Sequence, residues 1–212
     1  MIGDKNNAKA GMYPISSICR LRINSDGEGV RTLILLSGCP LRCKYCINPF
    51  TWNGSRKSKY LSAEELYSMI GSDRLYLLAT NGGVTFGGGE PLLYPHLIEE
   101  FRKILDGELT IYVETSLHVS WKNVEQIIPF VDRYYIDIKT LSSSLYYDYT
   151  GGNLELVISN LKRMITTVDA DKIIVRIPEI SGLVGNEQQL NERELLLQMG
   201  VKKFDLFKYR LQ

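Results

Sequence analysis

Short apolar runs alternate with amphipathic segments along most of the chain, and this alternation limits the possible folds more than any other feature of the sequence. Strands are predicted at residues 32–36, 83–86, 109–114, 133–138, 172–177 and 201–207, and helices at residues 61–70, 95–106, 121–128, 153–167 and 187–199. Strands that alternate with helices predict a parallel sheet covered by helices. Six strands are fewer than the eight of a closed barrel. We therefore expect an α/β fold, an open, partial (β/α)6 barrel.

The composition is that of an ordinary globular protein. Apolar residues make up 44% of the 212 residues, charged residues 23%, and the net charge is +1. This charge gives no reason to expect nucleic acid or a membrane as partner. The polar N-terminus has no apolar segment of a secretory signal, so a cytoplasmic protein is expected. We expect one domain over residues 1–212, in which residues 1–12 form a flexible tail.

Polar and reactive residues follow one strand after another. Because the carboxyl ends of parallel strands share one rim of such a sheet, and ligands bind at that rim, we expect these residues to lie together. They are Cys39, Cys43 and Cys46 after the first strand, residues 87–91 after the second, Glu114 and Thr115 at the end of the third, Asp137 and Lys139 at the fourth, and Arg176 at the fifth.

Three of the four cysteines are crowded into one loop as Cys39-x3-Cys43-x2-Cys46. Thiolates select zinc or iron–sulfur clusters. A four-iron cluster usually has four cysteine ligands, but the fourth cysteine, Cys19, lies far upstream in an alternating segment that could bury it. Three ligands would leave one iron open for chemistry. The alternative is a structural zinc site in which Cys19 or His96 supplies the fourth ligand.

The cysteine spacing, with the aromatic Tyr45 before the third cysteine, resembles the cluster motif of the radical S-adenosylmethionine superfamily. The stretch TFGGGEP at residues 85–91 resembles the GGE motif of that superfamily, at Gly88, Gly89 and Glu90. The resemblance implies a radical SAM barrel, with a [4Fe–4S] cluster on the three cysteines that are the catalytic residues. It also implies that the cluster cleaves S-adenosylmethionine to a 5′-deoxyadenosyl radical. A backbone carbonyl or carboxylate of the GGE motif would then accept a hydrogen bond from the ammonium group of the methionine part of this cofactor.

Residues 25–54, with DG-x-G-x-R before the cysteines and NP-x-TW after them, resemble the glycyl radical enzyme activating enzymes, typified by pyruvate formate-lyase activating enzyme. YIDIKT, VRIPEISG and FDLFKYR resemble later segments of the same family. The resemblance implies that Lys139 reaches the cofactor carboxylate and that Glu114, Thr115 and Asp137 hold a monovalent cation. The whole implied cofactor site comprises Tyr45, Cys46, Ile47, Gly88, Gly89, Glu90, Thr115, Asp137, Lys139, Arg176 and Arg210.

The sequence departs from the family pattern at several positions. Ile47 and Arg210 stand where the family has histidine, Glu114 stands where it has aspartate, and Gly87 replaces a small polar residue. The chain also stops soon after its sixth predicted strand, which predicts a wide lateral opening. A wide opening suits a protein loop better than a small molecule that must be sealed from water. We expect such a loop to enter near residues 26–31 and Arg210.

The sequence thus favours an oxidoreductase that abstracts hydrogen from a glycine of a partner glycyl radical enzyme. Its electron would come from a donor such as flavodoxin or ferredoxin. Two other enzyme functions stay open, an anaerobic ribonucleotide reductase activase and a small-molecule radical enzyme resembling the 7-carboxy-7-deazaguanine synthases. A non-catalytic zinc or iron–sulfur binding module is the remaining alternative.

Overall fold

The computed structural model describes residues 11–23, 25–52, 58–105 and 107–209. Its eight-stranded sheet has the order β3-β1-β2-β4-β5-β6-β7-β8. The predicted strands form the parallel part of this sheet. Within the described residues, the two end strands β3 and β8 do not pair with each other, so the prediction of an open α/β barrel is confirmed. This parallel part consists of β2 Val30–Leu36, β4 Gly83–Gly88, β5 Thr110–Thr115, β6 Arg133–Asp137, β7 Ile173–Glu179 and β8 Lys203–Lys208.

Two antiparallel strands extend the sheet at one edge and were not predicted. The long strand β1 (Tyr13–Ile23) pairs with β2, and the short β3 (Lys59–Leu61) pairs with β1. Two register shifts interrupt β1, so its side chains do not alternate regularly. Most of the expected N-terminal tail, residues 1–10, lies outside the described residues, and β1 begins at residue 13.

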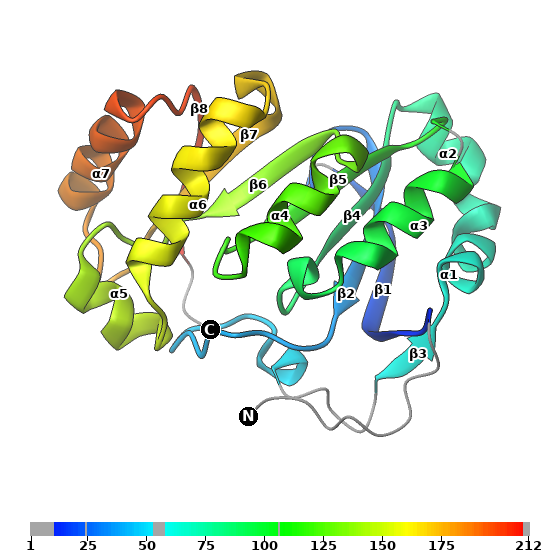
Figure 1. The fold of residues 1–212 in the computed structure, drawn as a ribbon, viewed down its shortest axis with the longest axis horizontal. Helices are drawn as coiled ribbons and strands as arrows, with labels where there is room; N and C mark the ends of the chain where they lie inside the picture. The colour runs from blue at the N-terminus through cyan, green and yellow to red at the C-terminus, as the bar shows by residue number, and fades with distance from the viewer. Residues whose placement is uncertain (1–10, 24, 53–57, 106, 210–212) are drawn as a thin grey trace.

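Helices cover the outer face of the sheet, and Figure 1 shows α3, α4 and α6 lying side by side across it. A capping box of Ser62 and Glu65 starts α1, which lies within the predicted helix at residues 61–70. Two of the helices, α2 and α5, were not predicted. The helices are α1 Ala63–Ile70, α2 Arg74–Ala79, α3 Pro95–Leu105, α4 Trp121–Ile127, α5 Ser143–Thr150, α6 Leu154–Thr167 and α7 Asn186–Gln198, with short 3-10 turns at Pro49–Thr51, Gly71–Asp73, Pro91–Leu93, Ile128–Phe130 and Ala170–Lys172.

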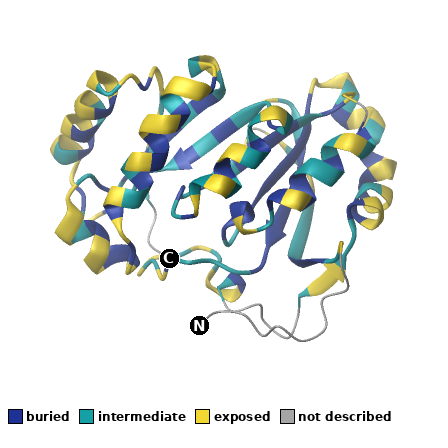
Figure 2. Cartoon of the chain, viewed as in Figure 1, coloured by how far each residue is buried: buried dark blue, intermediate teal, exposed yellow. Residues whose placement is uncertain are grey.

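The main core lies between these helices and the sheet. Ile34 and Leu36 of β2 point into it together with Phe86, while Leu33 and Leu35 point to the inner, concave side. In Figure 2 the strands are largely buried and the helices turn exposed faces outward. None of the described helices combines the length and the apolar character that a membrane span requires.

The inner face of the sheet has a polar floor built around Arg31. Its side chain is fully buried, donates to the hydroxyls of Thr85 and Thr110 at 2.7 and 3.0 Å, and lies 3.5 Å from the centre of the Tyr112 ring. Burial lowers the pKa of Arg31 to about 10. Arg31 is therefore an interior residue of the segment near which a substrate loop is expected to enter, and its side chain is not exposed to such a loop.

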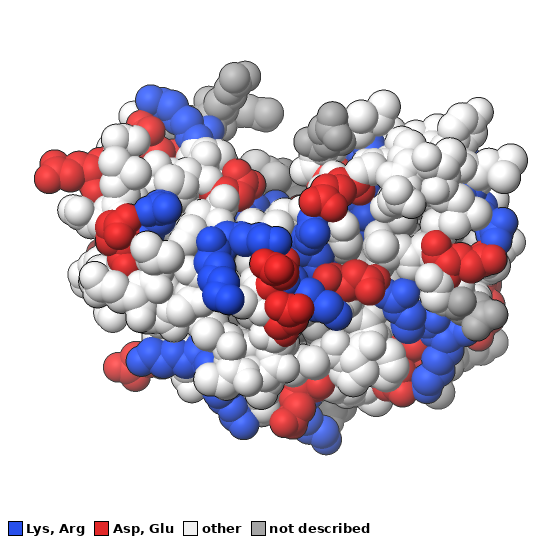
Figure 3. All heavy atoms as spheres, turned by 90° about the horizontal axis from the view of Figure 1, so that it is seen from above, with Lys and Arg blue, Asp and Glu red and all other residues white. Residues whose placement is uncertain are grey.

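Charges on the opposite side from the cysteine loop are mixed in sign. On the face drawn in Figure 3, Lys and Arg atoms alternate with Asp and Glu atoms rather than forming a patch of one sign. Arg102 with Asp132 and Arg133 with Glu28 are two of the ion pairs at this end of the barrel.

Candidate functional site

A cavity of about 450 Å³ lies at the carboxyl ends of the parallel strands. Residues of the cysteine loop, and residues in or just after each parallel strand, line this cavity, as the rim argument predicts. The predicted site residues that line it are Cys39, Cys43, Tyr45, Cys46, Ile47, Gly88, Gly89, Glu114, Thr115, Asp137, Lys139 and Arg176. Glu90 does not line it, and Arg210 lies outside the described residues.

Backbone hydrogen bonds to three other segments hold the cysteine loop over the cavity. Gly38 N–H donates to Thr51 O at 2.6 Å, and Gly38 O accepts from Glu90 N–H at 2.8 Å. Further along, Arg42 N–H donates to Thr150 O at 2.7 Å. The loop is therefore bound to the GGE segment on one side and to α5 on the other.

Burial favours the protonated form of two of the cysteine thiols, those of Cys39 and Cys43. Burial raises the pKa of Cys39 to about 12, with a further contribution from the nearby Glu90 carboxylate. Burial also raises the pKa of Cys43, against an opposing effect of Lys139. A bound metal centre lowers the pKa of the thiols that ligate it, because a coordinated thiol loses its proton. Three cysteines that share one cavity are a donor set suited to a thiolate-ligated centre.

The side chains proposed for a zinc site do not gather around one point. Within the described ranges, no group of three His, Cys, Asp or Glu side chains is arranged to hold a single metal ion. His96 lies on α3 with Gln126 as its neighbour at 2.8 Å and does not line the cavity, so it is not placed as a fourth ligand. Cys19 does line the cavity, although the sequence favoured its burial away from the site.

The GGE segment brings its backbone, rather than its acidic side chain, to the cavity. Gly88 has a φ of 101°, and a Cβ on Gly89 would lie 2.1 Å from Gly38 O, so both positions require glycine. The Glu90 carboxylate is fully buried and accepts from Thr115 Oγ1 at 2.7 Å and from Ser116 Oγ at 2.7 Å. The expected ammonium contact is therefore open to the backbone of this segment and not to the Glu90 carboxylate.

A chain of alternating charges runs along the cavity wall. Arg176 donates to Glu114 Oε1 at 2.8 Å and to Asp137 Oδ1 at 2.7 Å, and Lys139 lies 3.1 Å from Asp137 Oδ2. Burial by itself raises the pKa of Asp137, but Arg176 and Lys139 outweigh burial and hold this pKa at about 2. Burial raises the pKa of Glu114, and Arg176 offsets this rise only in part.

The residues expected to hold a monovalent cation are all occupied by other groups. Glu114 and Asp137 both accept from Arg176, whose guanidinium supplies the positive charge between them. Thr115 Oγ1 donates to Glu90 and accepts from Leu117 N–H at 2.9 Å. A cation would have to displace Arg176 from these carboxylates, and the cation site stays a prediction.

Several residues of the cavity were missed by the sequence analysis. Arg22 forms an ion pair at the β1 side with Asp26, which belongs to the segment predicted for loop entry, and Phe207 and Tyr209 lie at the end of β8. Tyr149 of α5 also lines the cavity. The rule that sites lie at strand carboxyl ends could have found the β8 pair, but the sequence carries no signal for a site residue on the unpredicted α5.

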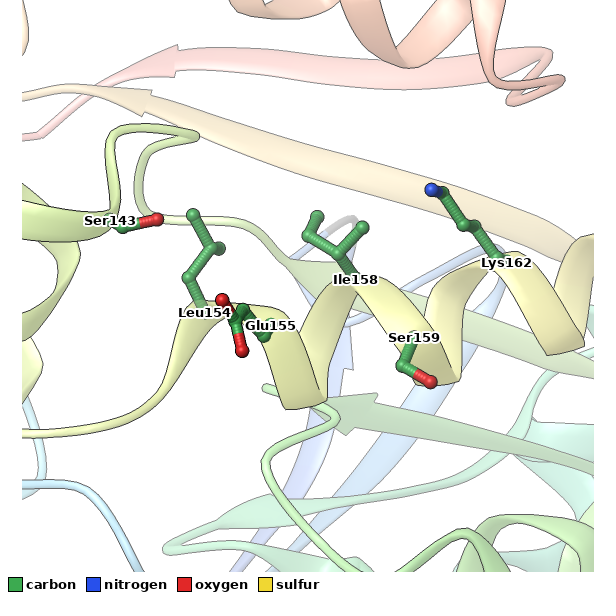
Figure 4. Close-up of a pocket in the computed structure, with 6 residues that line it drawn as sticks. All are labelled: Ser143, Leu154, Glu155, Ile158, Ser159 and Lys162. Carbon is green, nitrogen blue, oxygen red and sulfur yellow. The ribbon is translucent and has the colours of Figure 1, made fainter.

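A second, separate hollow lies on the outer surface of α6. Figure 4 shows Leu154, Glu155, Ile158, Ser159 and Lys162 projecting from this helix, with Ser143 at the start of α5. Its volume is about 390 Å³, and none of the predicted site residues line it. The rim cavity is therefore the candidate site.

Curated relatives of this chain are activating enzymes. A segment of 126 residues is 36% identical to the pyruvate formate-lyase-activating enzyme of Clostridium pasteurianum, covering 59% of this chain and 52% of that protein. The chain is 27% identical over 238 residues to the (2S)-3-sulfopropanediol dehydratase activating enzyme of Klebsiella oxytoca, covering 84% of this chain and 74% of that protein. The chain thus matches about half the length of the first relative. The resemblance to glycyl radical enzyme activating enzymes, predicted from the motifs, is confirmed.

The fold has solved counterparts, and a family model matches most of the barrel. The structure of QueE from Escherichia coli superimposes with a TM-score of 0.56 at 16% identity, covering 92% of this chain and 93% of that one, which bears on the fold alone. The model described as Radical SAM superfamily matches residues 33–175, from β2 through the cysteine loop and GGE segment into β7. The chain belongs to the radical SAM superfamily of enzymes.

Proposed function

We propose that the chain holds a [4Fe–4S] cluster on Cys39, Cys43 and Cys46 and uses it with S-adenosylmethionine to abstract hydrogen from a glycine of a partner enzyme. The observation that carries this proposal is that the three cysteines share one cavity with the Asp137–Lys139–Arg176 charges and the GGE backbone. The cluster, when bound and reduced, would supply one electron that cleaves the sulfonium of S-adenosylmethionine to methionine and a 5′-deoxyadenosyl radical.

The remaining residues would bind and orient the cofactor. Lys139, on the cavity wall, would pair with the methionine carboxylate, since a charge-assisted hydrogen bond is strong in a buried site. Carbonyl groups of Gly88 and Gly89 would accept from the ammonium because no side chain separates them from the cavity. Leu33, Leu35 and the buried Leu41 would exclude water from the reacting atoms.

A protein loop is the substrate that we propose, delivered by a glycyl radical enzyme. The cysteine loop carries two exposed apolar side chains beside the cavity, Ile47 at 75% and Phe50 at 49% exposure. Such side chains suit a face that a partner covers during reaction. An electron donor such as flavodoxin or ferredoxin would reduce the cluster beforehand. We also propose that residues 1–212 act as one domain.

The test combines the reconstituted, reduced protein with S-adenosylmethionine and candidate glycyl radical enzymes under strict anaerobiosis. Electron paramagnetic resonance should show a glycyl doublet, together with 5′-deoxyadenosine in equal amount. Cys39→Ala, Cys43→Ala and Cys46→Ala should each lose the iron–sulfur absorbance. Cys19→Ala should keep it, because three ligands suffice for the proposed cluster.

Other outcomes point to the other functions. Turnover of a small molecule with cofactor cleavage, but with no radical on any protein, would favour a small-molecule radical enzyme. A colourless protein that retains zinc after aerobic and anaerobic purification would contradict the proposal altogether.

A further inference from the structure

Glu192 of α7 is a buried acidic residue that does not line the rim cavity. One carboxylate oxygen, Oε1, accepts from the Thr140 hydroxyl at 2.6 Å and from the Leu141 N–H at 2.9 Å. The Gln188 amide, one turn earlier on α7, donates to the same oxygen at 3.0 Å. The other oxygen, Oε2, has no hydrogen-bond partner among the described residues. Burial of a carboxylate costs free energy, so a carboxylate held in this way calls for an explanation.

The segment that Glu192 holds follows directly on Lys139, just beyond the end of β6. Lys139 lines the cavity, whereas the next residue, Thr140, is fully buried and does not line it. These two neighbouring side chains therefore turn to different sides, Lys139 toward the cavity and Thr140 toward α7. On the other side of Lys139, the Ile138 N–H donates to Arg176 O at 3.0 Å. The backbone is thus fixed immediately before and immediately after Lys139.

The Thr140 hydroxyl uses its full hydrogen-bonding capacity. It donates to Glu192, and it accepts from the Ser142 N–H at 3.2 Å and from the Gln188 amide at 3.1 Å. Without the Glu192 carboxylate, this hydroxyl and the Leu141 N–H would both lose their acceptor. Glu192 therefore favours one conformation of the segment that follows Lys139.

We propose that Glu192, through Thr140 and the backbone, positions Lys139 to pair with the carboxylate of S-adenosylmethionine. This inference rests on the proposed function, in which Lys139 makes that pair. A lysine side chain is long and flexible, and the Lys139 ammonium is also attracted to Asp137 Oδ2 at 3.1 Å. A fixed backbone limits the positions that the ammonium can reach, so the pair forms with a smaller cost of ordering. Glu192 itself touches no cofactor and is a positioning residue.

The test measures S-adenosylmethionine binding to the cluster-loaded protein while the cluster is oxidised, so that no cleavage takes place. Glu192→Met removes the acceptor and keeps a similar volume. It should weaken binding about fivefold to tenfold, a part of what a charge-assisted hydrogen bond contributes. Glu192→Gln keeps an oxygen that can accept from Thr140 and should bind within about twofold of the wild type. The iron bound per chain should be equal in all three proteins.

A double-mutant cycle with Lys139→Ala separates positioning from a general structural effect. In the Lys139→Ala background, Glu192→Met should change the dissociation constant by less than about twofold, because the side chain that Glu192 positions is absent. An effect of Glu192→Met that is equally large in both backgrounds would show that Glu192 acts on binding by another route, and would overturn the inference.

A second pair of variants tests the other end of the same hydrogen bond, and it carries the test if Glu192→Met does not fold. Thr140→Val removes the hydroxyl and should weaken binding as Glu192→Met does, whereas Thr140→Ser keeps the hydroxyl and should restore it. Arg102→Met is the control for lost stability. It removes hydrogen bonds to Leu109 O and Phe130 O, just before β5 and β6 and away from the cavity, so its folded fraction should bind as the wild type does.

The two proposals fail in different ways. A wild-type chain that assembles no cluster, or that binds no S-adenosylmethionine, contradicts the proposed function and removes this inference with it. Equal binding by the wild type and by Lys139→Ala contradicts the pairing of Lys139 with the cofactor, and with it this inference, but not the proposed cluster. Weakened binding by Lys139→Ala, together with wild-type binding by Glu192→Met and Thr140→Val, contradicts the role of Glu192 alone.

Discussion

Asp137 shows how single residues set the charge of the site. Its two carboxylate oxygens are divided between two cations, Arg176 at 2.7 Å and Lys139 at 3.1 Å. Arg176 also reaches Glu114, so two carboxylates and two cations form one nearly neutral group of partly buried side chains. The sequence indicated that these residues would meet, because they end neighbouring strands. It could not show that the arginine would lie between the two carboxylates, since this depends on rotamers and on the register of β6 and β7.

The pKa of Asp137 predicts how its contribution to stability varies with pH. Its value of about 2 lies below the ordinary 3.8, so Asp137 stabilises the fold above pH 4 and loses this effect as pH falls toward 2. We expect Asp137→Asn to lower the free energy of unfolding by about 2 kcal/mol at pH 7, with about half of that difference gone at pH 3. Urea unfolding of both proteins between pH 3 and 7 tests this. A difference that stays constant with pH would contradict the role assigned to the Asp137 charge.

At the scale of elements, the sequence predicts the parallel strands and the larger helices because their apolar patterns are regular. It fails for β1, where Leu21 has a φ of 53° and register shifts break the alternation. It also fails for α5, whose sequence SSLYYDYT has no clear apolar stripe. That helix is held by tertiary contacts instead, through Tyr146 in the main core and through its carbonyls bonded to the cysteine loop. Patterns within a segment cannot reveal contacts of this kind.

The junction between α5 and the cysteine loop has no room for a side chain at Gly152. A Cβ there would lie 2.4 Å from Leu41 Cδ2 and 3.1 Å from His118 Cδ2. We expect Gly152→Ala to displace Leu41 and the cysteine loop, to lower the free energy of unfolding by about 1–3 kcal/mol, and to lower the iron bound per chain after reconstitution. Urea unfolding and iron analysis measure both effects.

Two further variants separate this clash from a general effect of alanine. Gly71→Ala is the matched control, because a Cβ at Gly71 meets no atom within 4 Å. Leu41→Ala should lower the free energy of unfolding less in the Gly152→Ala variant than in the wild type, because in that variant the smaller side chain at position 41 also removes the clash. Fully additive effects would show that Leu41 and Gly152 do not interact.

At the scale of the whole molecule, the inner face of the sheet divides into a structural floor and a reactive rim. The rim could be predicted because the carboxyl ends of parallel strands gather by topology alone. The floor could not, because Arg31 belongs to a motif that suggested contact with a partner. The Arg31 side chain is buried, and its hydrogen bonds connect β2 to β4 and β5.

Replacement of Arg31 tests that division. Arg31→Met leaves Val84 O and Thr110 O without their buried donor and removes the contact with Tyr112. We expect the free energy of unfolding to fall by about 2–4 kcal/mol, because several buried acceptors lose a partner at once. Arg74→Met is the control: Arg74 and its partner Glu108 form an ion pair that is exposed to solvent, so its loss should change the free energy of unfolding little. The folded fraction of Arg31→Met should bind a partner enzyme as the wild type does, since the side chain is inaccessible. Wild-type stability combined with weakened partner binding would instead place Arg31 in the substrate interface.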